Sequence, residues 1–156
     1  MLGQAPTGTI AGELTIVVLF NTSIRQDLAA PEDFDAPGAR LVGPSPLYRA
    51  HEVLTVLDSF NPSVIVWTEQ CKTDVFLELG WDLAKVAALI REAIAGGRLI
   101  GSEWCEQKPD GPCAPCDAYE VVRTSGNPRK LYVKFAISKT GMTILVASCH
   151  KSRLKK

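Results

Sequence analysis

Hydrophobic and polar residues alternate most clearly near the C-terminal end of the chain, between residues 131 and 137. Apolar side chains occupy every second position there, as in a strand with one buried face: Leu131, Val133, Phe135 and Ile137. A second apolar run ends in a polar cluster at residues 148–153. The two runs predict a β-hairpin, joined by the three-residue loop 139–141 whose glycine adopts a positive φ.

The length of this loop decides which side chains share a face, because side chains of a strand alternate with a period of two. A three-residue loop places Tyr132, Lys134, Ser148 and His150 together on one face. The apolar residues of the first strand then share the other face with three residues of the second strand, which are Leu145, Ala147 and Cys149. A tyrosine, a lysine, a serine and a histidine on one face indicate a site that binds an anion or transfers protons.

Helical patterns dominate the middle of the chain. Three helices are predicted, over residues 45–60, 68–79 and 82–96, with Ser45, Thr68 and Asp82 as capping residues. A short apolar run at 64–67 is expected to be extended. Further strands are predicted at 98–100 and 119–123, and the proline-rich stretch 105–116 between them is expected to be a loop. This order favours an α+β fold with N-terminal helices packed on a small antiparallel sheet, which the C-terminal part mainly forms.

The first 44 residues differ in composition from the rest. They are rich in Gly, Pro, Ala and Asp, with one strand-like run at 14–20 and an acidic segment at 31–35. We expect an N-terminal extension that either adds one edge strand or is partly disordered, followed by one domain over residues 45–156. No apolar run reaches the 18 residues typical of a membrane span, and no signal peptide is apparent, so we expect a cytoplasmic protein.

Charge is unevenly distributed although the whole chain is neutral. Residues 1–97 contain 6 Lys and Arg against 12 Asp and Glu, a net charge of −6, whereas residues 98–156 contain 11 against 5, a net charge of +6. The C-terminal part therefore has the charge of a module that binds a polyanion. The alternative is that the two parts pair their charges, or that the acidic part simply faces solvent.

Two sets of residues are candidates for chemistry. His150 lies at a strand end near Lys151 and Arg153, where it could exchange protons or contact phosphate at neutral pH. The second set could hold zinc through four Cys or His ligands, and the alternative is unligated thiols. Its members are Cys105, Cys113 and Cys116, with Cys149 or His150 as the fourth ligand. The chain has no phosphate-binding glycine loop, zinc-protease motif or nucleophile elbow.

From residue 44 onward the chain resembles the MqsR-type toxins of bacterial toxin–antitoxin pairs. The likeness rests on the segments 46–49 (PLYR), 76–82 (FLELGWD), 117–119 (DAY) and 131–134 (LYVK), and on a final Val-Ala-Ser strand. The resemblance implies a RelE-like fold and a ribonuclease that cleaves mRNA without a metal or other cofactor. It also implies that a cognate antitoxin protein holds the ribonuclease inactive.

The resemblance also suggests which residues would act. Tyr132 matches the family's sheet tyrosine, and Lys108 matches its loop lysine loosely. Two positions depart from the family, since His150 falls where a lysine is expected and Cys116 where a glutamine is expected.

Our hypothesis is an endoribonuclease with catalytic residues on the polar face of the hairpin, namely His150, Tyr132 and Lys134. Four basic residues would contact the RNA: Lys151, Arg153, Arg123 and Lys108. Two other classes of function remain open. One is a non-catalytic RNA- or protein-binding module with a zinc site at the cysteines. The other is a partner-binding protein whose acidic extension covers the basic sheet.

Overall fold

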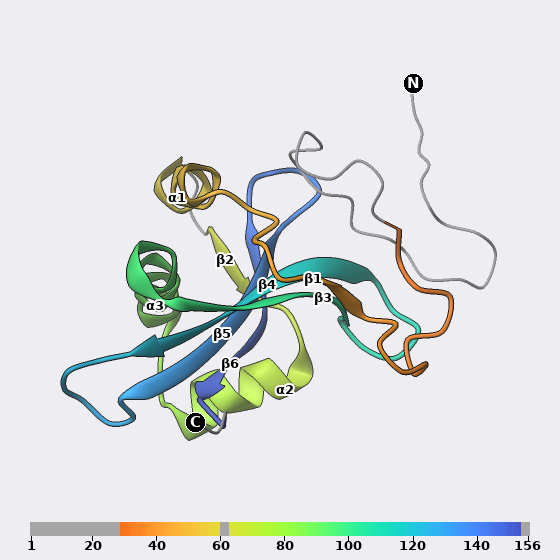
Figure 1. Ribbon diagram of the computed structural model, residues 1–156. Coiled ribbons are helices and arrows are strands. Elements are labelled where there is room, and N and C mark those ends of the chain that lie inside the picture. Colours follow the sequence, from red (N-terminus) through yellow and green to blue (C-terminus); the bar gives the residue numbers. More distant parts are fainter. Residues whose placement is uncertain (1–28, 60–62, 154–156) are drawn as a thin grey trace.

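The computed structural model describes residues 29–59 and 63–153, which form a six-stranded sheet, three α-helices and one π-helical segment (Figure 1). The strands are β1 (Leu41–Gly43), β2 (Val64–Val66), β3 (Arg98–Glu106), β4 (Cys113–Val122), β5 (Lys130–Ile137) and β6 (Ile144–Lys151). The helices are α1 (Ala50–Ser59), α2 (Glu69–Lys72) and α3 (Leu83–Gly96), with the π-helical segment η1 (Thr73–Glu78) directly after α2.

The strands follow the order β1-β3-β4-β5-β6-β2 across the sheet. Neighbouring strands are antiparallel except at one edge, where β2 runs parallel to β6. The predicted α+β class is confirmed, but the sheet is mixed rather than purely antiparallel. The predicted order of helices before strands is also only approximate, since β1 and β2 precede α2 and α3 in the chain.

One face of the sheet is covered by α1 and α3, which lie side by side in Figure 1. We call it the helix-covered face. Its strand residues are fully buried, including Leu131, Val133 and Phe135, and the ring of Phe135 stacks on Tyr119 with centroids 5.9 Å apart. The buried stripe of α3 packs in the same cluster and consists of Val86, Leu89, Ile90 and Ala93. This face therefore holds most of the apolar core.

The start of α1 is attached to this face by a buried carboxylate. Asp117 of β4 accepts hydrogen bonds from the backbone N–H groups of Leu47 and Tyr48 at 2.9 and 3.0 Å, and from the Ser102 hydroxyl at 2.6 Å. The predicted cap at Ser45 is wrong, because α1 begins only at Ala50 and the N–H groups of Leu47 and Tyr48 instead bind Asp117, about 70 residues away. The caps at Thr68 and Asp82 are confirmed, since their side chains accept from the backbone N–H groups of Cys71 and Lys85.

The opposite face, which we call the polar face, carries the alternate side chains of the same strands. The sheet curves toward the polar face. The evidence is a hydrogen bond of 3.1 Å from the Gln107 side chain, which follows β3, to the Trp67 carbonyl, which follows β2. Three strands lie between β3 and β2, and a flat sheet would separate them by roughly 19 Å. Since α1 and α3 occupy the other face, the two ends approach each other over the polar face, which is therefore concave.

The hairpin β5–β6 pairs Tyr132 with His150 and Lys134 with Ser148, so the predicted polar face is confirmed. The predicted three-residue loop is wrong. Ser138 N–H donates to the Thr143 carbonyl, and Ile137 pairs with Ile144, which leaves a loop of one residue more. A β-bulge between the pairs Lys134–Ser148 and Phe135–Val146 takes up the extra residue. Because the longer loop shifts the alternation in β6 as far as the bulge, Leu145 lies opposite Ala136 and not on the predicted apolar face.

Two other predicted segments differ from the structure. The stretch 105–116 was expected to be a loop, but β3 continues to Glu106 and β4 begins at Cys113. The predicted second helix is divided into the short α2 and the π-helical η1, which ends at Glu78, and Gly80 follows with a φ of 67°. Figure 1 shows α2 beside β6, and the Thr68 hydroxyl donates to the Ala147 carbonyl at 3.1 Å.

Part of the N-terminal extension belongs to the sheet. Its edge strand is β1, whereas the strand-like run at 14–20 lies outside the described residues. Phe34 of the acidic segment packs with Trp104 and Cys113, on the side of β3 opposite to Cys105. In the part of the chain that the structure describes, no helix has the length and apolar character needed to cross a membrane.

Candidate functional site

Tyr132 and His150 form the centre of the candidate site. They are directly opposite each other on β5 and β6, and their rings stack with centroids 5.1 Å apart and planes 17° apart. Both residues are half-buried. Burial raises the pKa of the Tyr132 hydroxyl, which outweighs the lowering by the Lys134 ammonium. Tyr132 is therefore a hydrogen-bond donor throughout the neutral pH range.

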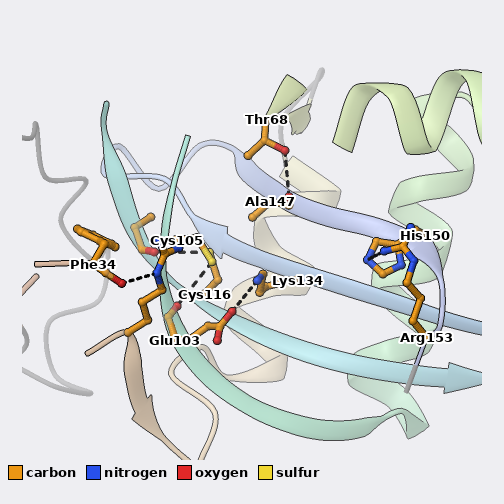
Figure 2. A network of polar contacts seen from close by, with 11 residues as sticks. Phe34, Thr68, Glu103, Cys105, Cys116, Lys134, Ala147, His150 and Arg153 are labelled. Carbon is orange, nitrogen blue, oxygen red and sulfur yellow. Dashed lines mark hydrogen bonds and ion pairs between the residues drawn. The ribbon is translucent and has the colours of Figure 1, made fainter. Parts of the chain in front are cut away.

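The hydrogen bonds of His150 define its protonation state. Nδ1 lies 2.7 Å from the Lys151 carbonyl oxygen, which can only accept, so Nδ1 carries a proton. Nε2 lies 3.2 Å from Nη1 of Arg153, which can only donate, so Nε2 presents its lone pair (Figure 2). The ring is thus placed as a neutral imidazole whose Nε2 can accept a proton.

Electrostatics support the same state. Burial lowers the pKa of His150, and the Arg153 and Lys134 cations lower it further. The Lys151 carbonyl and the Asp74 carboxylate of η1 act in the opposite direction, but the net direction is down from the usual value of 6.5. At pH 7 the imidazole is therefore mostly neutral, as a general base requires.

Lys134 is held by an acidic partner. Its Nζ lies 2.6 Å from Oε2 of Glu103, and the lysine side chain is only 14% exposed (Figure 2). Burial lowers its pKa, but nearby groups outweigh this effect, in the order Cys105, Tyr132 and Glu103, so the pKa is raised above its usual value. Lys134 is a permanent cation whose charge is already paired with Glu103.

Two thiols lie beside this ion pair. Cys105 of β3 and Cys116 of β4 are buried on the polar face, and their electrostatic interaction shifts the pKa values of both thiols. The contact with Cys116 lowers the pKa of Cys105, and the Lys134 cation lowers it further. The same contact raises the pKa of Cys116, and burial adds to this increase. The Cys116 thiol donates to the Ala114 carbonyl at 3.6 Å, and a thiol cannot replace both functions of the amide that the resemblance implies at this position.

The proposed zinc ligands do not converge. Strand alternation places Cys113 on the same side of β4 as Pro115, and Cys149 on the helix-covered face, whereas Cys105 and Cys116 lie on the polar face. All five cysteines are buried free thiols. Within residues 29–59 and 63–153, no group of three or more Cys, His, Asp or Glu side chains is arranged to hold a metal ion.

Of the predicted RNA-contacting residues, only Arg153 reaches His150. Lys151 pairs with Leu131 across the strands, so its side chain points to the opposite face. Arg123 forms a two-pronged ion pair with Glu92 of α3, with N–O distances of 2.9 and 2.8 Å. Lys108 follows the end of β3, whereas Tyr132 is level with its beginning. These three residues are therefore not brought to the candidate site.

Sequence reasoning missed two acidic residues of the polar face. Glu103 binds Lys134, and Glu120 of β4 is the direct cross-strand neighbour of Tyr132. The alternation in β4 does place Glu120 on the face opposite Tyr119 and Val121, so its side was readable from the sequence. Its neighbours were not, because Arg98 and Ser152 reach it from other strands.

No family model matches the chain, and no curated protein or solved structure matches it either. The functional argument therefore rests on the residues themselves. They provide a neutral imidazole, a protonated phenol and two cations on one concave face, of which one cation is already paired with a carboxylate.

Proposed function

We propose that the protein is a metal-independent endoribonuclease that cleaves RNA through the ribose 2′-hydroxyl. The observation that supports this proposal most strongly is that Tyr132 and His150 stack while the Arg153 side chain contacts Nε2 of the imidazole. RNA cleavage of this kind requires a base for the 2′-hydroxyl, a cation for the phosphate and a donor for the leaving oxygen. The three side chains supply one group for each requirement.

In the proposed reaction, the phosphate draws Arg153 away from His150 and thereby frees the lone pair of Nε2. His150 takes the proton of the 2′-hydroxyl as the 2′-oxygen attacks the phosphorus. The bond from phosphorus to the 5′-oxygen breaks, and the Tyr132 hydroxyl gives its proton to that oxygen. The products are a 2′,3′-cyclic phosphate and a 5′-hydroxyl. The resulting tyrosinate recovers its proton from the imidazolium through solvent.

Lys134 has a supporting role in this proposal. Its charge is paired with Glu103, so it contributes positive potential to the face but does not present a free ammonium group. Direct contact with phosphate would require the exchange of Glu103 for a phosphate oxygen. We therefore assign the main phosphate contact to Arg153, and we assign none to Arg123 or Lys108.

The resemblance to MqsR-type toxins supports two finer parts of the proposal. These are a RelE-like arrangement of the fold and control by a cognate antitoxin in the cytoplasm. Expression of the chain alone should arrest growth, and co-expression of a small neighbouring reading frame should restore it. Growth arrest that persists in the His150→Ala variant would contradict a toxic role for the proposed chemistry.

The direct test incubates the purified protein with a mixed-sequence single-stranded RNA in EDTA. We expect cleavage that leaves 2′,3′-cyclic phosphate ends and that falls about 10²- to 10⁴-fold in the His150→Ala variant. His51→Ala is the matched control, because His51 is an exposed residue of α1. A 2′-deoxy nucleotide at the cleaved position should block the reaction there.

Two outcomes would overturn the enzymatic proposal. One is a folded protein that binds RNA without cleaving it, which would favour the binding module instead. The other is cleavage that survives in both the His150→Ala variant and the deoxy substrate, which would place the chemistry elsewhere.

A further inference from the structure

Four side chains from four strands form one row across the polar face. Cross-strand pairing places Arg98 opposite Glu120, Glu120 opposite Tyr132, and Tyr132 opposite His150. The first two members are joined by an ion pair of 2.8 Å, and the last two by ring stacking. The row links the candidate site to Glu120, for which the proposed reaction provides no role.

Glu120 holds the chain where it leaves β6. Its Oε2 accepts a hydrogen bond of 2.6 Å from the Ser152 hydroxyl, while Oε1 accepts from Arg98. The Ser152 N–H also donates to the Lys130 carbonyl of β5 at 2.9 Å. Ser152 is thus fixed by two strands, although it lies beyond the end of β6.

The residue after Ser152 is Arg153, which contacts Nε2 of His150. An exposed arginine side chain has many conformations, and a surface contact seldom fixes it in one of them. Its backbone must therefore be held if its side chain is to remain at the imidazole. The Ser152–Glu120 hydrogen bond is the described side-chain contact adjacent to Arg153 in sequence that can do this.

We infer that Glu120 is a positioning residue, which fixes Ser152 and thereby places the Arg153 guanidinium at Nε2 of His150. This inference gives Arg153 its role in phosphate binding only if the proposed ribonuclease function holds, but the positioning itself does not depend on RNA. Glu120 does not act as a base here, because both of its oxygens accept hydrogen bonds and its side chain is only 10% exposed.

The protonation equilibrium of His150 reports whether Arg153 is in place. Four other groups face the imidazole: Tyr132, Lys134, the Lys151 carbonyl and Asp74 of η1. The Lys151 carbonyl belongs to the peptide bond with Ser152, and the hydrogen bond of 2.9 Å from the Ser152 N–H to the Lys130 carbonyl holds this peptide when the hydroxyl or Glu120 is removed. Loss of the anchor should therefore release Arg153 and raise the pKa of His150, while these four groups stay in place.

The experiment follows the His150 pKa by NMR titration of the full chain. The chain has only two histidines, so the His150→Ala variant assigns the signals. We expect Arg153→Gln to raise the pKa by about 0.5 unit, and Ser152→Ala and Glu120→Ala to raise it by a similar amount. Ser152→Ala combined with Arg153→Gln should give no further increase. Ser138→Ala, in the loop at the other end of the hairpin, is the matched control and should change nothing.

The sign of the Glu120→Ala effect separates positioning from simple electrostatics. Removal of a nearby carboxylate alone would lower the pKa of a histidine, whereas release of Arg153 raises it. Glu120→Gln keeps an oxygen that can accept from Ser152, so it should restore the wild-type arrangement and not raise the pKa. This variant also serves if Glu120→Ala does not fold.

The inference is overturned if Arg153→Gln raises the pKa but Ser152→Ala does not, since Arg153 is then placed without the anchor. It is equally overturned if Arg153→Gln has no effect. Failure of the ribonuclease proposal looks different, because RNA would remain intact in the cleavage assay while the shifts in pKa persist.

Discussion

The two faces of the sheet divide stability and chemistry between the alternate residues of the same strands. On the helix-covered face, β5 contributes Leu131, Val133 and Phe135, and all three are fully buried under α1 and α3. On the polar face, the intervening Tyr132 and Lys134 are half-buried beside charged partners. Neighbouring residues of β5 therefore differ in role, since one packs in the core and the next is a candidate functional residue.

This division explains how a small domain can hold a lysine, a histidine and two carboxylates close together. The core formed on one face fixes the strand register, and the register then sets every neighbour on the other face. The Tyr132–His150 stack, for example, needs no apolar packing of its own to keep the two rings opposite each other. Stability and activity should consequently respond to different substitutions, and three changes measure how far this separation holds.

The largest effect on stability should come from Phe135→Ala. Phe135 is completely buried and stacks on Tyr119, so its truncation removes a large apolar surface and leaves a cavity. We expect a loss of about 4 kcal/mol in the free energy of unfolding, measured by urea denaturation. Tyr132→Phe, three positions earlier on the polar face, should lose less than about 1 kcal/mol, because the ring remains. Equal losses in the two variants would contradict the division between the faces.

A smaller loss should follow from Asp117→Ala, which removes a fully buried carboxylate on the helix-covered face. The substitution leaves the backbone N–H groups of Leu47 and Tyr48 and the Ser102 hydroxyl without their shared acceptor. We expect the free energy of unfolding to fall by about 3 kcal/mol in the same urea experiment.

Asp58→Ala is the matched control for this change, because Asp58 is an exposed acidic residue of α1 paired with Arg91. It should alter stability by less than about 0.5 kcal/mol. If Asp117→Ala proved as mild as Asp58→Ala, the attachment of α1 through Asp117 would not be a significant part of the core.

The polar face of the hairpin was predicted correctly, although the hairpin differs from the predicted one at two places whose effects on the alternation cancel. The loop is one residue longer than expected, and a bulge at Ala147 restores the alternation before Ser148. Alternation alone identified the pair Tyr132–His150, but the position of the bulge depends on distant residues. Thr68 donates to the Ala147 carbonyl, and the Trp67 N–H donates to the Val146 carbonyl. Contacts across almost 80 residues of chain leave no local pattern in the sequence.

Proline content misled the prediction for residues 105–116. Proline usually breaks strands because it lacks a backbone N–H, yet Pro115 lies within β4 and pairs with Trp104. The pairing of β4 with β5 begins only at Asp117, so Pro115 has a strand partner on one side alone. The missing N–H therefore breaks no bond to β5. A proline-containing strand can be recognised only when its neighbours in the sheet are known.

Site residues were predictable where one hairpin supplied them and were missed where several strands met. Tyr132, Lys134 and His150 come from neighbouring strands, and alternation placed them together. Glu103 reaches Lys134 from β3 across β4, and Arg123 turns to Glu92 of α3 instead of to the site. Net charge indicated a basic C-terminal part, but it could not show which cations already have acidic partners.

The smallest effect concerns the polar face and its dependence on pH. Because the folded state lowers the pKa of His150 below 6.5, the unfolded chain binds the proton more readily. The neutral imidazole therefore contributes stability above pH 6.5, and this contribution is lost as the pH falls through the folded-state pKa. We expect the wild type to lose more stability than His150→Gln between pH 7.5 and about 5.5, as measured by urea denaturation.

Between pH 7.5 and about 5.5, protonation of Glu120, the nearest carboxylate in the cross-strand row, does not contribute to the change in stability. The pKa of Glu120 is lowered by its hydrogen bonds from Ser152 and Arg98, so its protonation affects stability only below its usual value of 4.5. His51→Gln on α1 controls for the number of histidines, and the change in profile must be specific to His150→Gln. If the two profiles ran parallel, the imidazole would be as readily protonated in the folded state as in the unfolded chain. The lowering of the His150 pKa by burial and by Arg153 would then be contradicted.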